Sequence, residues 1–139
     1  MDSLHDRIGF LLRNAYQNLN RDFRKELTRE RITIHQYVVL QGLGDLGEAI
    51  QRTLAEHCAI EPSNLNVMIK RMKENGLIEH VGEAADPRGA LALTRRGRAV
   101  LRRFQDLDVA VTDRFLAPLT EAEAKTLRTA LTKLVQQSR

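Results

Sequence analysis

Apolar residues recur three and four positions apart along most of this chain, which is the pattern of amphipathic helices. The first such stripe predicts a long helix over residues 3–27, interrupted only by Gly9. A second helix is predicted from Thr33, whose hydroxyl suits an N-cap, to the glycines at 42 and 44. The chain therefore begins with two helices joined by a short polar connection.

Glycine and proline divide the next part of the chain. Three glycines in the stretch GLGDLGEAI (42–50) predict a loop, because glycine weakens helices. A short helix is predicted at about 51–58. A longer helix is predicted from Pro62, which suits a first helical turn, to Asn75 and Gly76.

The period of the apolar pattern then changes. LIEHVG (77–82) and ALAL (90–93) alternate around the tip EAADPRG, which predicts a two-stranded hairpin. A helix follows from a cap at Thr94 to about Pro118, and a last helix begins at Thr120. The predicted order is thus helix, turn, helix, hairpin, between long terminal helices.

Composition indicates a soluble globular domain. The chain has 139 residues, of which 42% are apolar and 29% charged, enough for a single core. No apolar run approaches the roughly 20 residues of a membrane span, and the N-terminal segment has no signal-peptide core. Cys58 is the only cysteine, which fits a reducing cytoplasm.

Positive charge is concentrated in one segment. The net charge is +4, and residues 70–103 hold nine Lys and Arg against four acidic residues. Such a run is commonly a solvated surface, but it also suits a polyanion such as DNA.

The predicted order of elements is that of a winged helix-turn-helix, whose second helix fits the major groove of DNA. One side of helix 62–75 is expected to pack on the domain: Leu65, Met68, Ile69 and Met72. The other side would face base edges, and Asn66 can pair with adenine through two hydrogen bonds. A solvated surface is the alternative for such a face, and the hairpin beyond it favours DNA.

The sequence resembles the MarR (multiple antibiotic resistance regulator) family of bacterial winged-helix transcription factors over nearly its whole length. The most specific match is the hairpin tip Asp86-x-Arg88 followed by Leu93-Thr94-x-x-Gly97. Supporting matches are Gln36-Tyr37-x-x-Leu40, Leu54-Ala55, Pro62-Ser63, Arg71 and Gly76-Leu77.

The resemblance implies a fold and an assembly. The fold class is mainly α with a small β-hairpin, in one domain over residues 1–139. A winged helix-turn-helix lobe at 33–103 is expected between dimerisation helices at 1–30 and 105–139. The implied assembly is a homodimer on a pseudo-palindromic operator in double-stranded DNA. The apolar stripes of the terminal helices fit a second subunit independently, since they are too extensive for so small a winged domain.

The resemblance also implies roles for residues. Arg88 at the wing tip would enter the minor groove, where negative potential attracts guanidinium groups, and Asp86 would orient the wing. The other candidates for base or phosphate contact are Ser63, Asn64, Asn66, Val67, Lys70, Arg71, Lys73 and Arg95. Ala59, Glu61 and Val67 depart from the residues usual in the family, and the wing is about one residue short, so the base contacts stay open.

Members of the family commonly bind small anionic or aromatic molecules between the dimer helices and the DNA-binding lobe. By resemblance, Tyr16, His35 and Tyr37 would lie near such a ligand. The alternative is that both tyrosines pack between helices and that His35 lies at the surface.

Other chemistry has little support in the residues. Cys58 falls where the family places a core leucine, so we expect a buried, inert thiol rather than a redox sensor. No two histidines have the i, i+4 spacing of a metal site, and no catalytic motif stands out.

The sequence therefore predicts a cytoplasmic, nucleoid-associated transcriptional regulator that binds DNA and has no cofactor or enzymatic activity. A repressor relieved by a ligand is expected. The alternative is a winged-helix protein-interaction module that does not bind DNA.

Overall fold

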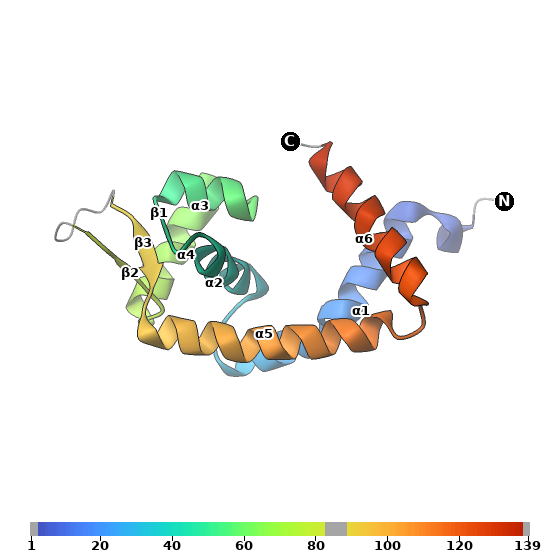
Figure 1. The fold of residues 1–139 in the computed structure, drawn as a ribbon, viewed down its shortest axis with the longest axis horizontal. Helices are drawn as coiled ribbons and strands as arrows, with labels where there is room; N and C mark the ends of the chain where they lie inside the picture. Colours follow the sequence, from blue (N-terminus) through green and yellow to red (C-terminus); the bar gives the residue numbers. More distant parts are fainter. Residues whose placement is uncertain (1–2, 83–88, 138–139) are drawn as a thin grey trace. The chain divides into compact units, whose positions relative to one another are not determined.

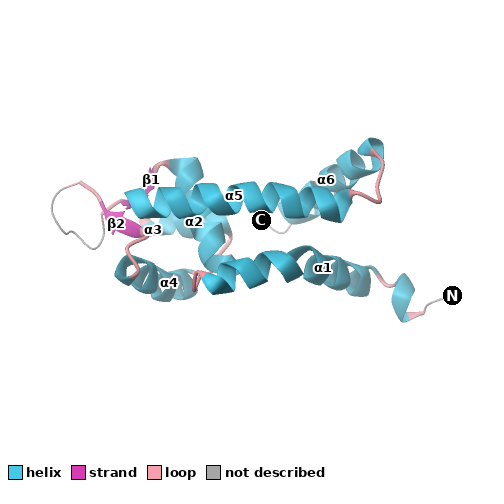
Figure 2. Ribbon diagram, turned by 90° about the horizontal axis from the view of Figure 1, so that it is seen from below, coloured by secondary structure: helices cyan, strands magenta, loops and turns pink. Residues whose placement is uncertain are grey.

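The computed structural model describes residues 3–82 and 89–137, and the chain forms two compact units. The first unit combines residues 1–23 with 108–139, and the second comprises 24–107. Both are mainly helical (Figures 1 and 2), as predicted. In chain order the elements are η1 (Leu4–Asp6), α1 (Ile8–Arg29), α2 (Ile34–Leu46), β1 (Glu48–Ala49), α3 (Gln51–Cys58), α4 (Pro62–Glu74), β2 (Ile78–His80), β3 (Leu91–Leu93), α5 (Arg95–Leu116) and α6 (Glu121–Gln136).

The core of the second unit lies where α2, α3 and α4 meet the small sheet (Figure 1). Helical spacing, or alternation in the strands, puts most of its apolar side chains on the inner faces of these elements, and Leu27 of α1 and Leu77 before β2 complete the core. Those that are at most 1% exposed are Leu27, Val39, Leu40, Leu43, Leu54, Leu65, Met72, Leu77 and Leu91. Removing these side chains from water is the main force that holds the unit together, and it fixes the rotation of each helix about its axis.

Two helices begin with a capping box. The Thr33 hydroxyl accepts the N–H of Gln36 at 3.0 Å, and the Gln36 side-chain oxygen accepts the N–H of Thr33 at 3.1 Å. Thr120 and Glu123 make the same reciprocal pair at the start of α6. The predicted N-caps at Thr33 and Thr120 are therefore confirmed, and each capping box satisfies two backbone donors that a helix start leaves free.

The predicted loop after α2 was wrong in its first half, because α2 continues through Gly42 and Gly44 to Leu46. Both glycines lie where neighbouring elements pack closely. A Cβ on Gly42 would collide with the sulfur of Cys58, and one on Gly44 would lie 2.8 Å from Leu101 Cδ2. Packing against α3 and α5 thus outweighs the low helix propensity of glycine, and α2 stays helical at both positions.

Among the described residues the sheet has three strands rather than the two that were predicted. Gly47, at φ +78°, ends α2 and leads into β1, which pairs antiparallel to β3 with Glu48 opposite Ala92. The predicted hairpin is present as β2 and β3, and the strand order is β1-β3-β2. A two-residue strand such as β1 is too short to show the apolar alternation on which strand prediction depends.

Hydrogen bonds join the start of α5 to the turn that follows α4. The Thr94 hydroxyl donates to the Gly76 carbonyl at 2.6 Å and accepts the N–H of Gly97 at 3.0 Å. Gly97 lies so close to Leu77 that an added Cβ would overlap the carbonyl oxygen of that residue. These contacts set where the hairpin leaves the helix-turn-helix.

The first unit is built from most of α1, the end of α5 and α6. The helix predicted over 3–27 starts later, because the hydroxyl of Ser3 caps the separate turn η1 and the extended residue Arg7 divides that turn from α1. Arg114 forms an ion pair with Asp22 at 3.3 Å. Within the described residues, α6 buries no side chain, and none of the helices has the length and apolar character needed to cross a membrane.

Candidate nucleic-acid interface

The helix α4 has a buried face and an exposed face. Leu65 and Met72 are 0% exposed and Ile69 is 4% exposed, so this side is in the core as predicted. Met68, predicted on the same side, is only half-buried. Val67 on the opposite side is 58% exposed. The core therefore turns the other flank of α4 outward.

This outward flank, called here the outer face of α4, is polar and basic. All of the candidate contact residues on the helix are exposed: Ser63, Asn64, Asn66, Val67, Lys70, Arg71 and Lys73. The major groove of B-DNA admits one α-helix, and Lys and Arg neutralise phosphates on either side of it. The structure brings the candidate residues of α4 onto one accessible surface.

The start of α4 suits an anion. Ala59, in the left-handed conformation at φ +54°, turns the chain between α3 and α4. Glu61 stands at the N-cap without a side-chain hydrogen bond, and Pro62 follows. No side-chain cap therefore covers the backbone N–H groups of Ser63 and Asn64, which lie at the positive end of the helix dipole. Phosphates bind at such helix ends.

A hydrogen bond joins α3 to the outer face of α4. Gln51 Nε2 donates to Asn66 Oδ1 at 3.0 Å. Gln51 was not among the predicted site residues, because a glutamine in the first turn of a short helix carries no local signal. Only the packing of α3 against α4 brings it beside Asn66.

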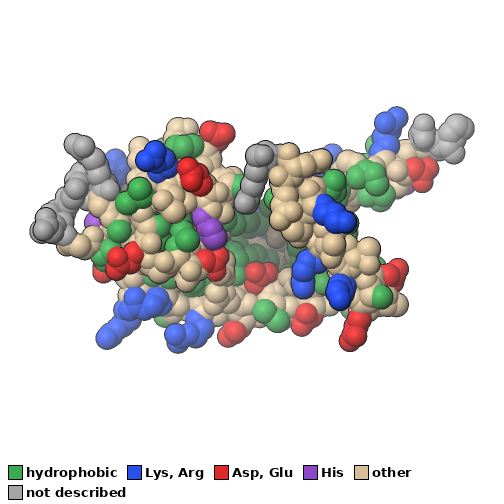
Figure 3. All heavy atoms as spheres, turned by 45° about the horizontal axis from the view of Figure 1, so that its top comes forward, with side chains coloured by type: hydrophobic (Ala, Val, Ile, Leu, Met, Phe, Trp, Pro, Cys, Tyr) green, Lys and Arg blue, Asp and Glu red, His purple; other side chains and the backbone are tan. Residues whose placement is uncertain are grey.

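The structure places part of the predicted wing. Asp86 and Arg88 lie outside the described residues. The strands that lead to the tip are in register, and the N–H of Val81 donates to the carbonyl of Ala90 at 2.8 Å. Arg95, which opens α5, is exposed, and Lys and Arg side chains gather near this end of the second unit (Figure 3).

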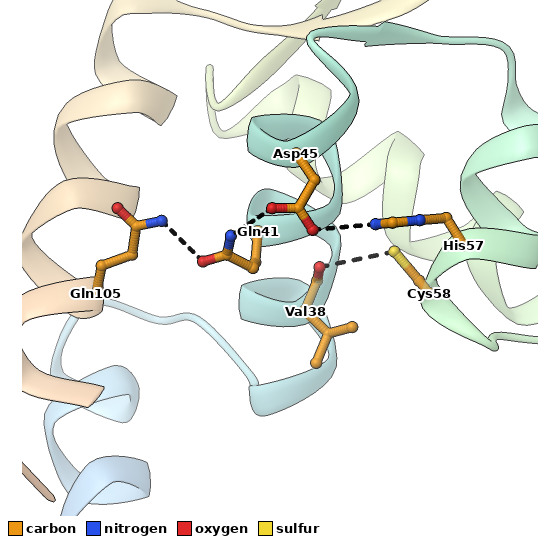
Figure 4. Close-up of polar contacts among 6 residues, drawn as sticks. All are labelled: Val38, Gln41, Asp45, His57, Cys58 and Gln105. Atoms are coloured by element: carbon orange, nitrogen blue, oxygen red, sulfur yellow. Dashed lines mark hydrogen bonds and ion pairs between the residues drawn. The ribbon is translucent and has the colours of Figure 1, made fainter. Parts of the chain in front are cut away.

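A line of polar contacts joins α5, α2 and α3 (Figure 4). Gln105 donates to Gln41 at 2.8 Å, Gln41 donates to Asp45 at 2.8 Å, and His57 Nε2 lies 3.0 Å from Asp45 Oδ2. The hydrogen bonds from His57 and then from Gln41 lower the pKa of Asp45. Since α3 leads directly into α4, these contacts help to hold α4 in place.

Cys58 ends α3 and is half-buried. Its thiol donates a weak hydrogen bond to the Val38 carbonyl at 3.6 Å. Burial raises the pKa of the Cys58 thiol, and the negative charge of Asp45 raises it further. A thiol that stays protonated is a poor nucleophile, so the surroundings of Cys58 support a structural role.

The three candidate ligand residues have different surroundings. Tyr37 is 7% exposed in the core of the second unit. His35 is exposed near the start of α2, and Tyr16 is 53% exposed on the part of α1 that belongs to the first unit. The alternative is therefore supported for Tyr37, which packs, and for His35, which lies at the surface, whereas Tyr16 is exposed rather than packed between helices.

Residues 32–88 match the sequence profile of the MarR family. Over this segment the chain is similar to the MarR family. The matched segment contains α2, α3 and α4, which are the helices that build the outer face of α4 and hold it in place. The resemblance inferred from the sequence motifs is thereby confirmed.

Relatives of this chain include the HTH-type transcriptional repressor Rv2887 of Mycobacterium tuberculosis. It is 26% identical over 128 residues, which cover 91% of this chain and 92% of that protein. The structure of Rv2887 in complex with DNA is similar with a TM-score of 0.72, at 26% identity, over 96% of this chain and 98% of that one.

A second solved relative is BpsR of Bordetella bronchiseptica, whose DNA binding is regulated by 6-hydroxynicotinic acid. It is 27% identical, with a TM-score of 0.83, and the match covers 97% of both chains. The predicted winged helix-turn-helix fold is confirmed by these similarities.

Proposed function

We propose that this chain is a homodimeric transcriptional repressor of the MarR family that leaves its pseudo-palindromic operator when a small anionic or aromatic effector binds. The observation that carries the proposal is the outer face of α4, which is exposed, polar and basic on a helix whose opposite face is buried. The DNA complex of Rv2887 supports the DNA partner, and the regulation of BpsR by 6-hydroxynicotinic acid supports the effector.

Each candidate residue has a role in this proposal. Ser63, Asn66 and Val67 contact base edges in the major groove, where Val67 meets a thymine methyl group. Asp86 and Arg88 form the tip of the wing, with Arg88 in the minor groove. The residues that contact phosphates are Asn64, Lys70, Arg71, Lys73 and Arg95.

The homodimer is supported by apolar side chains that one subunit leaves exposed. On α1, four such side chains are 44–67% exposed: Ile8, Leu11, Leu12 and Tyr16. On α6, three are 37–55% exposed: Leu131, Leu134 and Val135. The first unit also contains an apolar groove of about 450 Å³, lined in part by Leu19, Phe115 and Leu127. Exposed apolar surface of this extent marks an interaction site. A two-fold copy would cover it and present α4 twice to the operator.

The effector is proposed only as a chemical class. Tyr16 and His35 are exposed and can offer a hydroxyl and an imidazole to a carboxylate or a phenol. Fluorescence anisotropy of the protein on operator DNA, titrated with aromatic carboxylic acids, tests this part. Release of the DNA by none of them would contradict it.

Salt dependence tests whether the outer face of α4 binds phosphates. Among DNA fragments taken from around its own gene, at least one should be retained, and its log K should fall steeply as log salt rises. Lys70→Ala should reduce that slope by about one, because one phosphate contact is lost. Lys125→Ala on α6 is the matched control. A protein that retains no fragment at low salt would instead be an interaction module without DNA.

A further inference from the structure

We propose that Gln51 is a positioning residue that decides which bases Asn66 can recognise. The inference rests on the proposed binding of α4 to DNA. It assigns a role in sequence preference to a residue of α3, outside the recognition helix. The juxtaposition that carries it is the hydrogen bond from Gln51 Nε2 to Asn66 Oδ1 at 3.0 Å.

The backbone positions of both residues are set by the core. Gln51 lies in the first turn of α3, which is anchored by Leu54 at 0% exposure. Asn66 follows Leu65, which is also 0% exposed. With both helices held, the main freedom left to Asn66 is rotation of its own side chain. The terminal torsion of asparagine is broad when nothing restrains it, and the hydrogen bond from Gln51 supplies the restraint.

The direction of this hydrogen bond has a chemical consequence. A carboxamide carries its acceptor oxygen on one arm and its donor nitrogen on the other. Because Oδ1 of Asn66 faces Gln51, Nδ2 is left to be presented outward. On the outer face of α4, all of which the structure describes, Asn66 is the only side chain with a recorded hydrogen bond to another side chain. Its neighbours on the helix have no such restraint.

An asparagine presented in this way reads hydrogen-bond acceptors. The major groove offers acceptors at O6 and N7 of guanine, at O4 of thymine and at N7 of adenine, where the N6 amino donor lies beside it. A two-bond contact with adenine needs both arms of the amide to face the base, because Nδ2 donates to N7 and Oδ1 accepts from N6. With Oδ1 turned toward Gln51, only Nδ2 faces the base, so guanine or thymine, whose major-groove edges carry no amino donor, is favoured over the adenine contact that the sequence alone suggested.

Selection from a randomised duplex library measures the preference directly. The wild-type protein should select guanine or thymine at one symmetric pair of operator positions. Asn66→Ala should lose the preference at that pair alone. A preference that survives Asn66→Ala at every position would overturn the inference, because Asn66 would then read no base.

Two substitutions of Gln51 then test the positioning role. Gln51→Met removes the donor, and the selected bases at that pair should broaden. Gln51→Glu leaves only acceptors, so Asn66 should turn Nδ2 toward α3 and present Oδ1 to the DNA. The preference should shift toward cytosine or adenine, which carry amino donors, by about fivefold or more.

A control substitution separates reorientation of the Asn66 amide from repulsion between the added carboxylate and the DNA. Thr53→Glu adds the same charge two residues along α3, on a different side of the helix. It should weaken binding to all sequences alike and leave the selected bases unchanged. If Gln51→Met and Gln51→Glu both keep the wild-type preference, Gln51 does not position Asn66 and the inference is wrong. If the wild-type protein retains no duplex, the proposed repressor function itself fails.

Discussion

At the scale of single residues, Asp45 shows how a surface carboxylate outside α4 can help to hold that helix in place. It accepts hydrogen bonds from Gln41 on its own helix and contacts His57 on α3. Because α3 leads into α4, the contact restrains the helix that carries the outer face. Its contribution is modest, since the Asp45 side chain is 47% exposed and water screens the pair.

The Asp45 contact should make stability depend on pH. The pKa of Asp45 is lowered in the folded state. Its contribution is therefore present above the ordinary carboxyl pKa, about 4, and is lost as the pH falls through the lower folded value. Asp45→Asn should reduce the free energy of unfolding by about 0.5 kcal/mol near neutral pH and by less in acid. Urea unfolding of Asp45→Asn and the wild-type protein, once near neutral pH and once in acid, measures the difference in unfolding free energy. Asp106→Asn is the control.

Arg88 carries a second prediction at the residue scale. A guanidinium in the minor groove contributes a contact that depends on groove width, so Arg88→Ala should weaken operator binding by about 1–3 kcal/mol. Anisotropy titration of one operator at constant salt gives the value. Arg128→Ala on α6 serves as the control. Equal affinity of Arg88→Ala and the wild-type protein would argue against a wing that enters the minor groove.

At the scale of elements, glycine occurs where two elements pack too closely for a Cβ atom. In α2, Gly42 and Gly44 let α3 and α5 approach, and the helix persists through both. Gly97 does the same for α5 against the backbone of Leu77. Local rules assign glycine to loops, and they cannot anticipate a partner element that is distant in the sequence.

Gly97→Ala should destabilise the second unit. The added methyl group would overlap the Leu77 carbonyl, and backbone cannot move aside as a flexible side chain does. We expect the free energy of unfolding to fall by about 1–3 kcal/mol in urea denaturation. Gly9→Ala is the matched control, because a Cβ there meets nothing within 4 Å. That substitution should raise stability by up to about 1 kcal/mol, and equal effects of the two would refute the packing argument.

At the scale of the whole molecule, α6 has more apolar surface than one subunit uses. It buries no side chain among the described residues, yet it begins with a complete capping box and carries Leu131, Leu134 and Val135. A helix of 16 residues gains most of its stability from packing rather than propensity. Its partner in the proposed dimer is therefore part of what keeps it folded.

Leu131→Glu should dissociate the proposed dimer. A carboxylate in a covered apolar groove loses its hydration without gaining a partner, so the dimer dissociation constant should rise about tenfold or more. Sedimentation equilibrium measures the constant, and operator affinity should fall with it. Ala122→Glu adds the same charge at an exposed position of α6 that does not line the groove. A dimer unaffected by Leu131→Glu would place the interface elsewhere.

The sequence by itself determined the helices, the hairpin, the caps at Thr33 and Thr120, and which side of α4 is buried. These follow from local chemistry, because helical period and capping depend on residues at most a few positions apart. Only the tertiary structure decided that α2 runs through its glycines, that β1 joins the sheet, and that Gln51 meets Asn66. Each of these depends on a contact between segments far apart in the chain, which no local pattern encodes.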